Sequence, residues 1–412
     1  MNNDVKILRE LAGRYAIAAN DDRNYERRLL HKAVNDLHMI RPVVLIDELP
    51  WNELNGEGEL TLHCEDPFLR TVEQKLRQTL YKWNHFPADM IVTPYFGIDK
   101  VIHTTGNGVA IVENTIHADE TNHIVSHEFV DQMEDESFLE RLHNETISYD
   151  KEETERRYNL AANIIGDIIP VKIIGTPWVF DTCWDDIAEW HGVTNLLMDL
   201  AMRPEFMHAV ASKLTDIYLD KVRQYEELNL FEGFQPYLHS TSAYSDDLPS
   251  KEFDGIGFQA KDVWGRGAAQ VFSSVSPAMR EEFDITYMKK AMAPFGLVYY
   301  GCCEPLHNMI DIVEQIPNLR KITVTPWADV DIAAENIGKK YVIAHKPSPS
   351  NLAVDQLDEE VVRKELTRAI DACYRNGCSF DMVLKDISTV NYNPQNLVKW
   401  EKIAMELVQN YK

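Results

Sequence analysis

The residues best suited to metal chemistry are two adjacent cysteines at the end of a short apolar run. Cys302 and Cys303 follow residues 297–301 and precede Glu304. Thiolates and carboxylates bind zinc, and coordination lowers the pKa of a thiol. We therefore predict a metal site at Cys302, Cys303 and Glu304, with zinc as the expected metal. Adjacent strand side chains point to opposite faces, so the strand itself directs at most one cysteine inward. The open alternative is that both cysteines are small buried hydrophobic residues.

Three further residues could move protons or orient a substrate. Asp386 and His345 lie at the ends of apolar runs, and Asp246 belongs to an acidic pair in a loop. Carboxylates and imidazoles are the usual acid–base groups of enzymes, so we predict these three as catalytic. The structural alternatives stay open: an ion pair of Asp386 with Lys385 or Lys346, a buried rim histidine, and a capped turn.

Four side chains at or near the ends of such runs could line a substrate pocket. Aromatic rings bind apolar or methylated groups, and they equally serve as packing. The predicted substrate-binding residues are His239, Trp178, Tyr95 and Trp327.

A repeated alternation of apolar runs and helical stretches must position these residues. Eight runs are expected to be strands: 90–96, 170–175, 234–239, 269–274, 297–301, 321–326, 341–345 and 380–387. Eight strands alternating with helices predict an α/β fold, a closed (β/α)₈ TIM barrel whose strands end at one mouth. An open doubly wound sheet is the runner-up. The chain has no glycine-rich nucleotide loop.

The expected organisation has two parts. Residues 1–89 read as a helix-rich N-terminal cap with one strand candidate at 43–46, and residues 90–412 as the barrel. A long insertion at about 99–160 follows the first predicted strand. Within it, His123 and His127 have the spacing of two ligands on one helix face, or of a solvated lid.

Composition narrows the class of protein. The 412 residues carry a formal net charge of −25, with 45% hydrophobic residues. A protein that neutralises phosphates needs concentrated Lys and Arg, so nucleic acid and anionic membrane surfaces are not expected partners. No apolar run approaches the length of a membrane span, and the N-terminus lacks a signal-peptide pattern. Six cysteines in so long a chain predict a reducing, cytoplasmic location.

Several short motifs, in order along residues 160–412, resemble the uroporphyrinogen decarboxylase superfamily. They are Asp199-Leu-Ala-Met-Arg-Pro-Glu205, Ser245-Asp-Asp-Leu248 followed by Ser276-Pro-Ala-Met-Arg-Glu-Glu-Phe283, Leu297-Val-Tyr-Tyr-Gly-Cys-Cys303 and Asn393-Pro-Gln-Asn-Leu397. The resemblance implies a (β/α)₈ barrel. The run ending in Cys303 is similar to the strand on which the corrinoid-dependent methyltransferase branch carries H-x-C.

That branch binds zinc through His, Cys and Cys and moves methyl groups between a corrinoid and a thiol or a methylated compound. By resemblance the first family cysteine falls on Cys303, while Gly301 stands at the histidine position and Asp386 near the last cysteine. Either Glu304, His239, His345 and Asp386 supply the metal ligands that the family takes from its histidine and second cysteine, or no metal is bound.

The resemblance thus implies a cytoplasmic, metal-assisted methyltransferase. It would move a methyl group between a corrinoid such as methylcobalamin, carried by a partner protein, and a small methylated or thiol substrate. The runner-up is a cofactor-free decarboxylase of a carboxylated small molecule, with Asp246 and His239 as acid–base groups. A catalytically silent barrel that binds a methyl-transfer complex is the third possibility.

Overall fold

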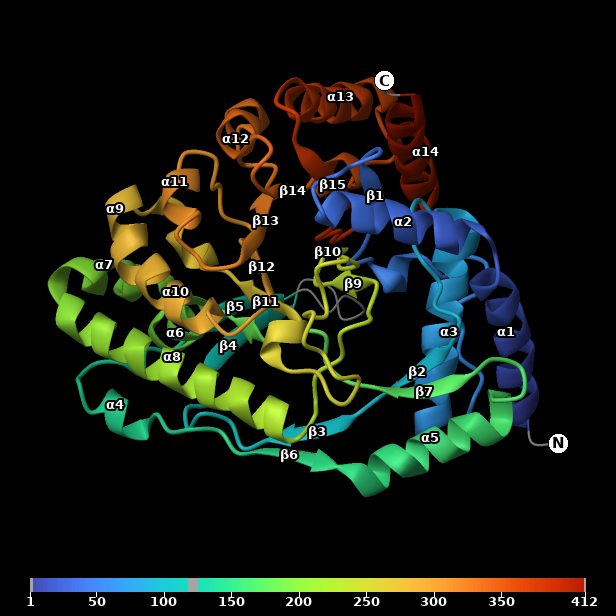
Figure 1. Cartoon of the computed structure of the whole chain (residues 1–412), viewed down its shortest axis with the longest axis horizontal. Coiled ribbons are helices and arrows are strands. Elements are labelled where there is room, and N and C mark those ends of the chain that lie inside the picture. Colours follow the sequence, from blue (N-terminus) through green and yellow to red (C-terminus); the bar gives the residue numbers. More distant parts are fainter. Residues whose placement is uncertain (1–2, 118–124, 411–412) are drawn as a thin grey trace.

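The computed structural model describes residues 3–117 and 125–410 and has a curved parallel sheet at its centre (Figure 1). This sheet has seven strands in the order β1-β15-β14-β13-β12-β11-β8. Their bounds are β1 Val43–Ile46, β15 Ser379–Leu384, β14 Val342–His345, β13 Leu319–Val324, β12 Leu297–Tyr300, β11 Trp264–Gly267 and β8 Phe180–Asp181. The α/β class is confirmed. No pairing joins β1 to β8 among the described residues, so closure into an eight-stranded barrel is not confirmed.

Four of the predicted runs form strands of this sheet: 297–301, 321–326, 341–345 and 380–387 correspond to β12, β13, β14 and β15. The strand predicted at 269–274 is wrong, because residues Gln270–Ser274 form a 3₁₀ helix and the strand is β11, just before it. β11 contains two glycines and an arginine, so a search for apolar runs does not identify it as a strand. A Cβ on Gly267 would lie 2.4 Å from the sulfur of Met288, so glycine permits close packing of the following helix.

The other three predicted runs lie outside the central sheet. β2 (Phe96–Asp99) and β7 (Val171–Ile174) pair with each other in a separate two-stranded parallel sheet. β9 (Tyr237–Leu238) forms an antiparallel hairpin with β10 (Thr241–Ser242). The place of the first strand is taken by β1, which comes from the segment assigned to the N-terminal cap and pairs with β15.

Fourteen α-helices are seen in the described ranges, and α9 to α13 lie along the outer side of strands β11 to β15 (Figure 1). Their bounds are α1 Asn3–Ala19, α2 Arg23–Asn35, α3 Pro67–His85, α4 Phe138–Arg141, α5 Lys151–Ile165, α6 Cys183–His191, α7 Val193–Met202, α8 Pro204–Glu227, α9 Pro277–Arg280, α10 Thr286–Met292, α11 Ile310–Val313, α12 Val330–Ile337, α13 Glu359–Arg375 and α14 Gln395–Asn410. The largest apolar cluster lies between the sheet and these outer helices, as in other α/β folds.

A second apolar cluster joins α1, α3 and α5 to β2 and β7, at the side of the molecule opposite α9 (Figure 1). Helix α3 begins where Asp66 accepts hydrogen bonds from the backbone N–H groups of Phe68 and Leu69, with Pro67 at its first position. From this group, α3 supplies Gln74, Arg77 and Gln78 to a cavity that also borders Glu48, two residues after β1.

The long insertion contains short antiparallel strands. β3 (Val101–Thr104) pairs with β6 (Ile147–Asp150), and β4 (Glu113–His117) pairs with β5 (Val125–Phe129). His127 lies on strand β5 rather than on a helix, and its Nδ1 is 2.7 Å from Glu113 Oε2. The helical reading of the insertion is therefore wrong at His127, while His123 lies outside the described residues.

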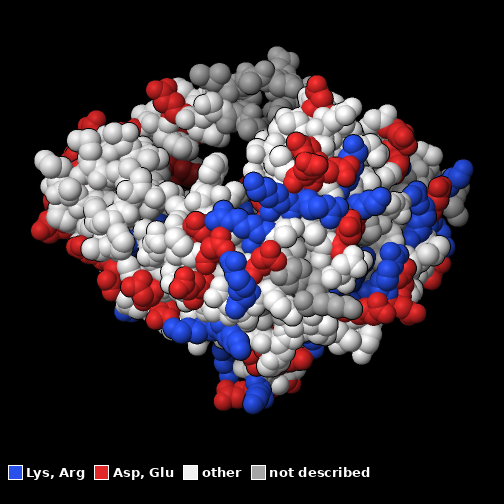
Figure 2. All heavy atoms as spheres, turned by 90° about the horizontal axis from the view of Figure 1, so that it is seen from above, with Lys and Arg blue, Asp and Glu red and all other residues white. Residues whose placement is uncertain are grey.

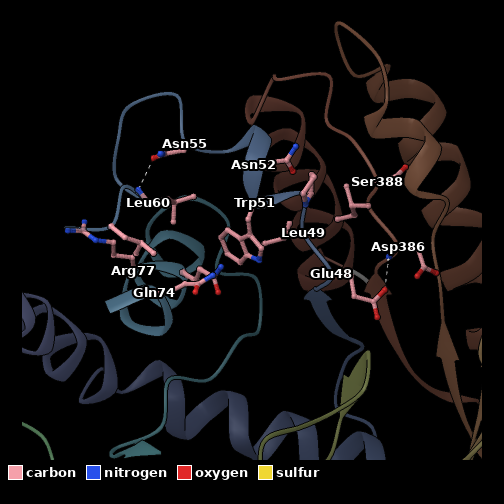
Figure 3. A pocket seen from close by; sticks show the side chains of 14 residues that line it. Glu48, Leu49, Trp51, Asn52, Asn55, Leu60, Gln74, Arg77, Asp386 and Ser388 are labelled. Carbon is pink, nitrogen blue, oxygen red and sulfur yellow. Dashed lines mark hydrogen bonds between the residues drawn. The ribbon is translucent and has the colours of Figure 1, made fainter. Parts of the chain in front are cut away.

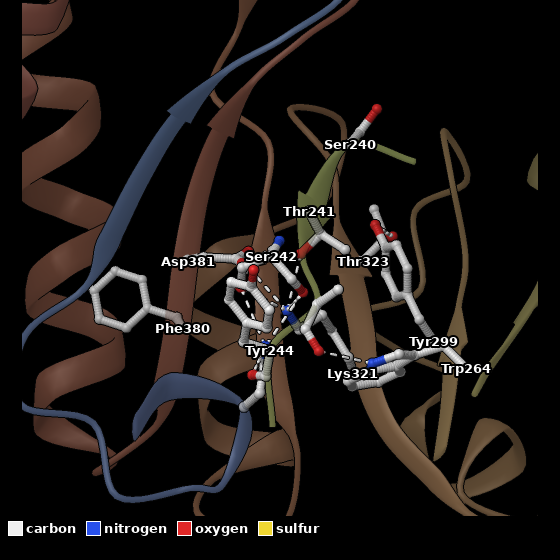
Figure 4. Close-up of polar contacts among 12 residues, drawn as sticks. Ser240, Thr241, Ser242, Tyr244, Trp264, Tyr299, Lys321, Thr323, Phe380 and Asp381 are labelled. Atoms are coloured by element: carbon white, nitrogen blue, oxygen red, sulfur yellow. Dashed lines mark hydrogen bonds and ion pairs between the residues drawn. The ribbon is translucent and has the colours of Figure 1, made fainter. Parts of the chain in front are cut away.

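The β9–β10 hairpin is fixed to the sheet by a buried ion pair (Figure 4). Lys321 Nζ on β13 lies 2.9 Å from Asp381 Oδ2 on β15, and both side chains are fully buried. The same ammonium donates to Thr241 Oγ1 at 2.9 Å and to the Ser242 carbonyl at 3.0 Å. The pair therefore positions the hairpin, and with it the two-residue turn His239–Ser240.

The surface carries charges of both signs. Over the face in Figure 2, Lys and Arg form a band bordered by Asp and Glu. In the described ranges, no helix is both long enough and apolar enough to cross a membrane.

Candidate functional site

A cluster of titratable side chains lies at the carboxyl ends of the central strands. Glu48 comes two residues after β1, Asp386 two residues after β15, and Cys302 two residues after β12. Strands β1 and β15 are neighbours in the sheet, which brings Glu48 and Asp386 together. The carboxyl ends of parallel strands are the usual place for ligands and catalytic groups in α/β folds.

Glu48 and Asp386 form a carboxyl pair. The backbone N–H of Asp386 donates to Glu48 Oε2 at 3.0 Å. Burial, and then the hydrogen bond with Asp386, raise the pKa of Glu48. Burial acts in the same direction on Asp386, but hydrogen bonds from Glu48 and Lys385 outweigh it and lower the pKa of Asp386. These opposite shifts favour a proton on Glu48 over one on Asp386.

The turn of the β9–β10 hairpin reaches this pair. Ser240 Oγ donates to Glu48 Oε1 at 2.7 Å, and His239 Nε2 lies 3.4 Å from the same oxygen. The Lys346 ammonium donates to the Ser240 carbonyl from β14, which fixes the turn against the sheet. These contacts place a hydroxyl and an imidazole on the carboxyl pair.

Backbone conformations at the site are unusual. Glu48, Ser240 and Asp386 have φ values of 50°, 53° and 55°, in the left-handed region that glycine favours. Such residues cost folding free energy and persist where the surrounding contacts hold them, often at functional sites. Gly301 has φ 95°, and a Cβ there would lie 2.7 Å from Leu306 Cδ1. The chain therefore turns sharply just before Cys302, as it does at the carboxyl pair.

Both predicted cysteine ligands lie in the cluster. Cys302 Sγ and Cys303 Sγ are 3.8 Å apart, and Cys303 Sγ is 3.8 Å from Asp386 Oδ2. The hydrogen bond from Cys303 lowers the pKa of Cys302 to about 3, against the effect of burial and with help from His239. The same hydrogen bond raises the pKa of Cys303. These shifts favour the thiolate at Cys302 and the thiol at Cys303.

The third predicted metal ligand, Glu304, points away from the thiols. It is fully buried, accepts a hydrogen bond from the backbone N–H of Cys302 at 2.9 Å, and lies 3.8 Å from Arg280 Nη1. Arg280 also contacts Asp284 at 3.1 Å and Tyr300 Oη at 2.9 Å. The structure thus gives Glu304 a positioning contact to the cysteine turn instead of a place among the metal donors.

A cavity of about 820 Å³ opens beside the carboxyl pair (Figure 3). Glu48 and Asp386 lie at one end, Trp51, Leu49 and Leu60 are among its apolar walls, and the opposite side carries the polar side chains of Gln74 and Arg77. A second cavity of about 690 Å³ also borders Trp51 and includes the predicted residue Trp178. A volume of several hundred Å³ suits a small-molecule ligand.

The other predicted site residues lie apart from this cluster. Asp246 has a side chain that is 71% exposed and pairs with Lys32 of α2. Its neighbour Asp247 binds Arg320 at 2.7 Å, at the amino end of β13. Because the cluster occupies the carboxyl ends of the strands, the structure separates Asp246 from Asp386 and His239.

His345 ends β14 but is buried, and burial lowers its pKa to about 4, which leaves it neutral. It makes no hydrogen bond to the thiols or carboxyl pair among the described residues. Tyr95 accepts a hydrogen bond from Gln235 at 3.2 Å near β2, and Trp327 is 77% exposed. These three side chains are not brought to the cluster.

Sequence reasoning missed three members of the cluster. Glu48 follows a recognised strand candidate, so its position after residues 43–46 was an available signal. Lys385 was considered only as an ion-pair partner of Asp386, which it is, at 2.9 Å. Ser240 carries no local signal, because its contact with Glu48 depends on a hairpin that is docked by long-range contacts.

The arrangement does not fit a metal ion. No group of three or more His, Cys, Asp or Glu side chains in residues 3–117 and 125–410 is arranged to hold one. The Lys385 ammonium lies 3.5 Å from Cys302 Sγ, 4.0 Å from Cys303 Sγ and 2.9 Å from Asp386 Oδ2. A divalent ion between these donors would meet a fixed positive charge. Zinc therefore stays a prediction that this geometry does not support.

A buried acid beside the site leads to a stability prediction. Burial raises the pKa of Asp181, at the end of β8, to about 7. A pKa raised above the unfolded value of 3.8 stabilises the folded state below about pH 4, and this contribution is lost as the pH rises to about 7. Asp181→Asn should therefore add about 2–4 kcal/mol to the free energy of unfolding at pH 8 and almost nothing at pH 4.

Urea unfolding at both pH values measures this effect. The matched control is Asp99→Asn, whose wild-type side chain is 75% exposed and which should show no such pH-dependent gain. An equal effect of Asp181→Asn at pH 4 and pH 8 would contradict the prediction.

The comparisons with known proteins bear on the fold. No protein-family model matches the chain, and no curated protein matches it in sequence. Among solved structures, a methyltransferase from Methanosarcina mazei is similar, with a TM-score of 0.51 and 11% sequence identity. The similarity covers 92% of this chain and 97% of the other. At this identity it supports a shared fold across nearly the whole chain.

Proposed function

We propose that the chain is a methyltransferase that moves a methyl group between a corrinoid on a partner protein and a small-molecule substrate. The observation that carries the proposal is the Glu48–Asp386 carboxyl pair at one end of the 820 Å³ cavity. The similarity in fold to the Methanosarcina mazei methyltransferase and the resemblance of the sequence motifs support the same class of reaction.

The chemistry of methyl transfer makes use of such a pair. When a substrate CH₃–X–R loses its methyl group, the electron pair of the C–X bond stays on the heteroatom X, which then takes up a proton. Glu48, whose pKa is raised, holds a proton at the cavity wall and can deliver it to X. In the reverse direction, the ionised pair takes the proton from an acceptor X–H, such as a thiol. A corrinoid bound at the opening of this cavity would accept or supply the methyl group.

Other residues of this chain set the conditions for that step. Lys385 and the hydroxyl of Ser240 stabilise the negative charge left on the carboxyl pair after proton delivery. Trp51 and Leu49 can cover the apolar part of a substrate and exclude water from the reacting atoms. The expected metal assistance is not part of this proposal, because the Lys385 ammonium lies beside the side chains that would hold a metal.

A transfer assay with free cobalamin tests the proposal. The purified protein is mixed with methylcobalamin and a panel of small thiols, and separately with reduced cobalamin and methylated amines or ethers. We expect protein-dependent gain or loss of the cobalt–methyl absorption with at least one substrate. Release of CO₂ from a carboxylated compound without methyl transfer would favour the decarboxylase instead. That alternative assigned Asp246 and His239 as acid–base groups of one site, whereas the side chain of Asp246 pairs with Lys32.

A further inference from the structure

The Lys385 ammonium occupies the space between the donors of the cluster. Its three nearest acceptors are Cys302 Sγ at 3.5 Å, Cys303 Sγ at 4.0 Å and Asp386 Oδ2 at 2.9 Å. An ammonium group has three N–H donors, so these three contacts match its full donor capacity. The lysine thus satisfies two sulfurs and a carboxylate at once.

Burial keeps the ammonium in this place. The Lys385 side chain is only 4% exposed, whereas Asp386 beside it is 52% exposed. Moving the ammonium away would leave two sulfurs and a carboxylate without their cation inside the protein, which is costly. Two further cations, Arg266 and Lys346, are also buried and contribute to the field at Cys302. A divalent ion would add two positive charges to a region that already holds the three buried cations Lys385, Arg266 and Lys346.

We infer that Lys385 replaces a metal ion as the resident cation of this thiol site, so that Cys302, Cys303 and Asp386 form a metal-free centre. The donor set is one that zinc would accept, since two sulfurs and a carboxylate are suitable ligands. What prevents binding is the ammonium between them. Removing that ammonium should therefore turn the centre into a site for a thiophilic divalent ion.

Cobalt(II) is a suitable probe, because sulfur coordination gives it a charge-transfer absorption in the near ultraviolet. The full-length wild-type protein should show no sulfur–cobalt band. Lys385→Ala should show it at about one ion per chain, with an affinity at least about a hundred-fold above that of the wild type, as expected for loss of a unit charge at about 3–4 Å. The double variant Lys385→Ala/Cys302→Ser should lose the band.

Two controls sharpen the test. Lys340→Ala removes a lysine that is 64% exposed and far from the thiols in sequence, and it should behave as wild type. Lys385→Gln keeps most of the side-chain volume without the charge, and it serves if thermal unfolding shows that the alanine variant is not folded.

Two results would overturn the inference. One is stoichiometric zinc in the purified wild-type protein, or a sulfur–cobalt band on adding cobalt to it, which would support the zinc prediction. The other is the absence of cobalt binding in both folded Lys385 variants. The readout is metal binding and concerns the same site as the proposed methyl transfer, but it does not depend on that activity. Failure of the cobalt test is thus distinguishable from failure of the transfer assay.

Discussion

Replacing Lys321 with methionine is expected to lower the free energy of unfolding by about 3–5 kcal/mol. The substitution leaves Asp381 buried without the ammonium that lies 2.9 Å from it. It also removes the donor to Thr241 and to the Ser242 carbonyl, so the β9–β10 hairpin loses its link to the sheet. Chemical denaturation at pH 7, followed by circular dichroism, measures the loss.

Two further variants separate the ion pair from general disturbance of the core. The double variant Lys321→Met/Asp381→Leu removes both charges and should recover much of the lost stability, because an apolar pair replaces the uncompensated carboxylate. Lys340→Met removes an exposed lysine paired with Glu314 and should change stability by less than about 1 kcal/mol. If the double variant is less stable than Lys321→Met, the ion pair does not explain the loss.

Glu48→Gln is expected to lower the turnover number of methyl transfer by about 100-fold or more, with a small change in KM. An amide keeps the shape of the carboxyl group but cannot deliver or take up the proton that the reaction requires. Ser240 Oγ donates to Glu48 Oε1 and the Asp386 N–H to Oε2, so the single amide oxygen can keep one of these two hydrogen bonds. The fold should therefore stay intact while the chemical step slows.

The pH dependence of turnover adds a second readout. Wild-type turnover in the demethylating direction should fall as the pH rises through the raised pKa of Glu48, because the proton donor is lost. The Glu48→Gln variant should lose this dependence. Glu252→Gln, at a side chain that is 80% exposed, is the matched control and should keep wild-type turnover and pH profile. Turnover within a few-fold of wild type in Glu48→Gln would remove the carboxyl pair from the mechanism.

Some strands of the structure could be identified from the sequence and others could not. The runs that became β12 to β15 are continuous and β-branched, so their local pattern was enough to identify them. The glycine-rich β11 lacked such a pattern, although the packing of α10 requires its glycines. The run at 170–175 formed β7 in another sheet, because an apolar run does not specify its partner. The strand predicted at 90–96 is wrong except at Phe96, where β2 begins.

The site shows the same division. The motifs after the strands identified Cys302, Cys303, Asp386 and His239, which the structure brings together. The acidic pair at Asp246 looked equally suitable in the sequence, yet its loop lies at the amino ends of the strands, away from the cluster. A loop residue carries no information about which end of a strand it will approach, so only the tertiary contacts could decide between them.

The sequence by itself determined the α/β class, the chemical types available at the strand ends and a formal net charge of −25. These properties follow from local periodicity and composition, which are written directly in the order of residues. Only the tertiary structure decided that β1 lies beside β15, and hence that Glu48 faces Asp386. It also placed the Lys385 ammonium among the sulfurs, where the sequence suggested a metal. These contacts join residues 83 and 338 positions apart, and they depend on the packing of the whole chain.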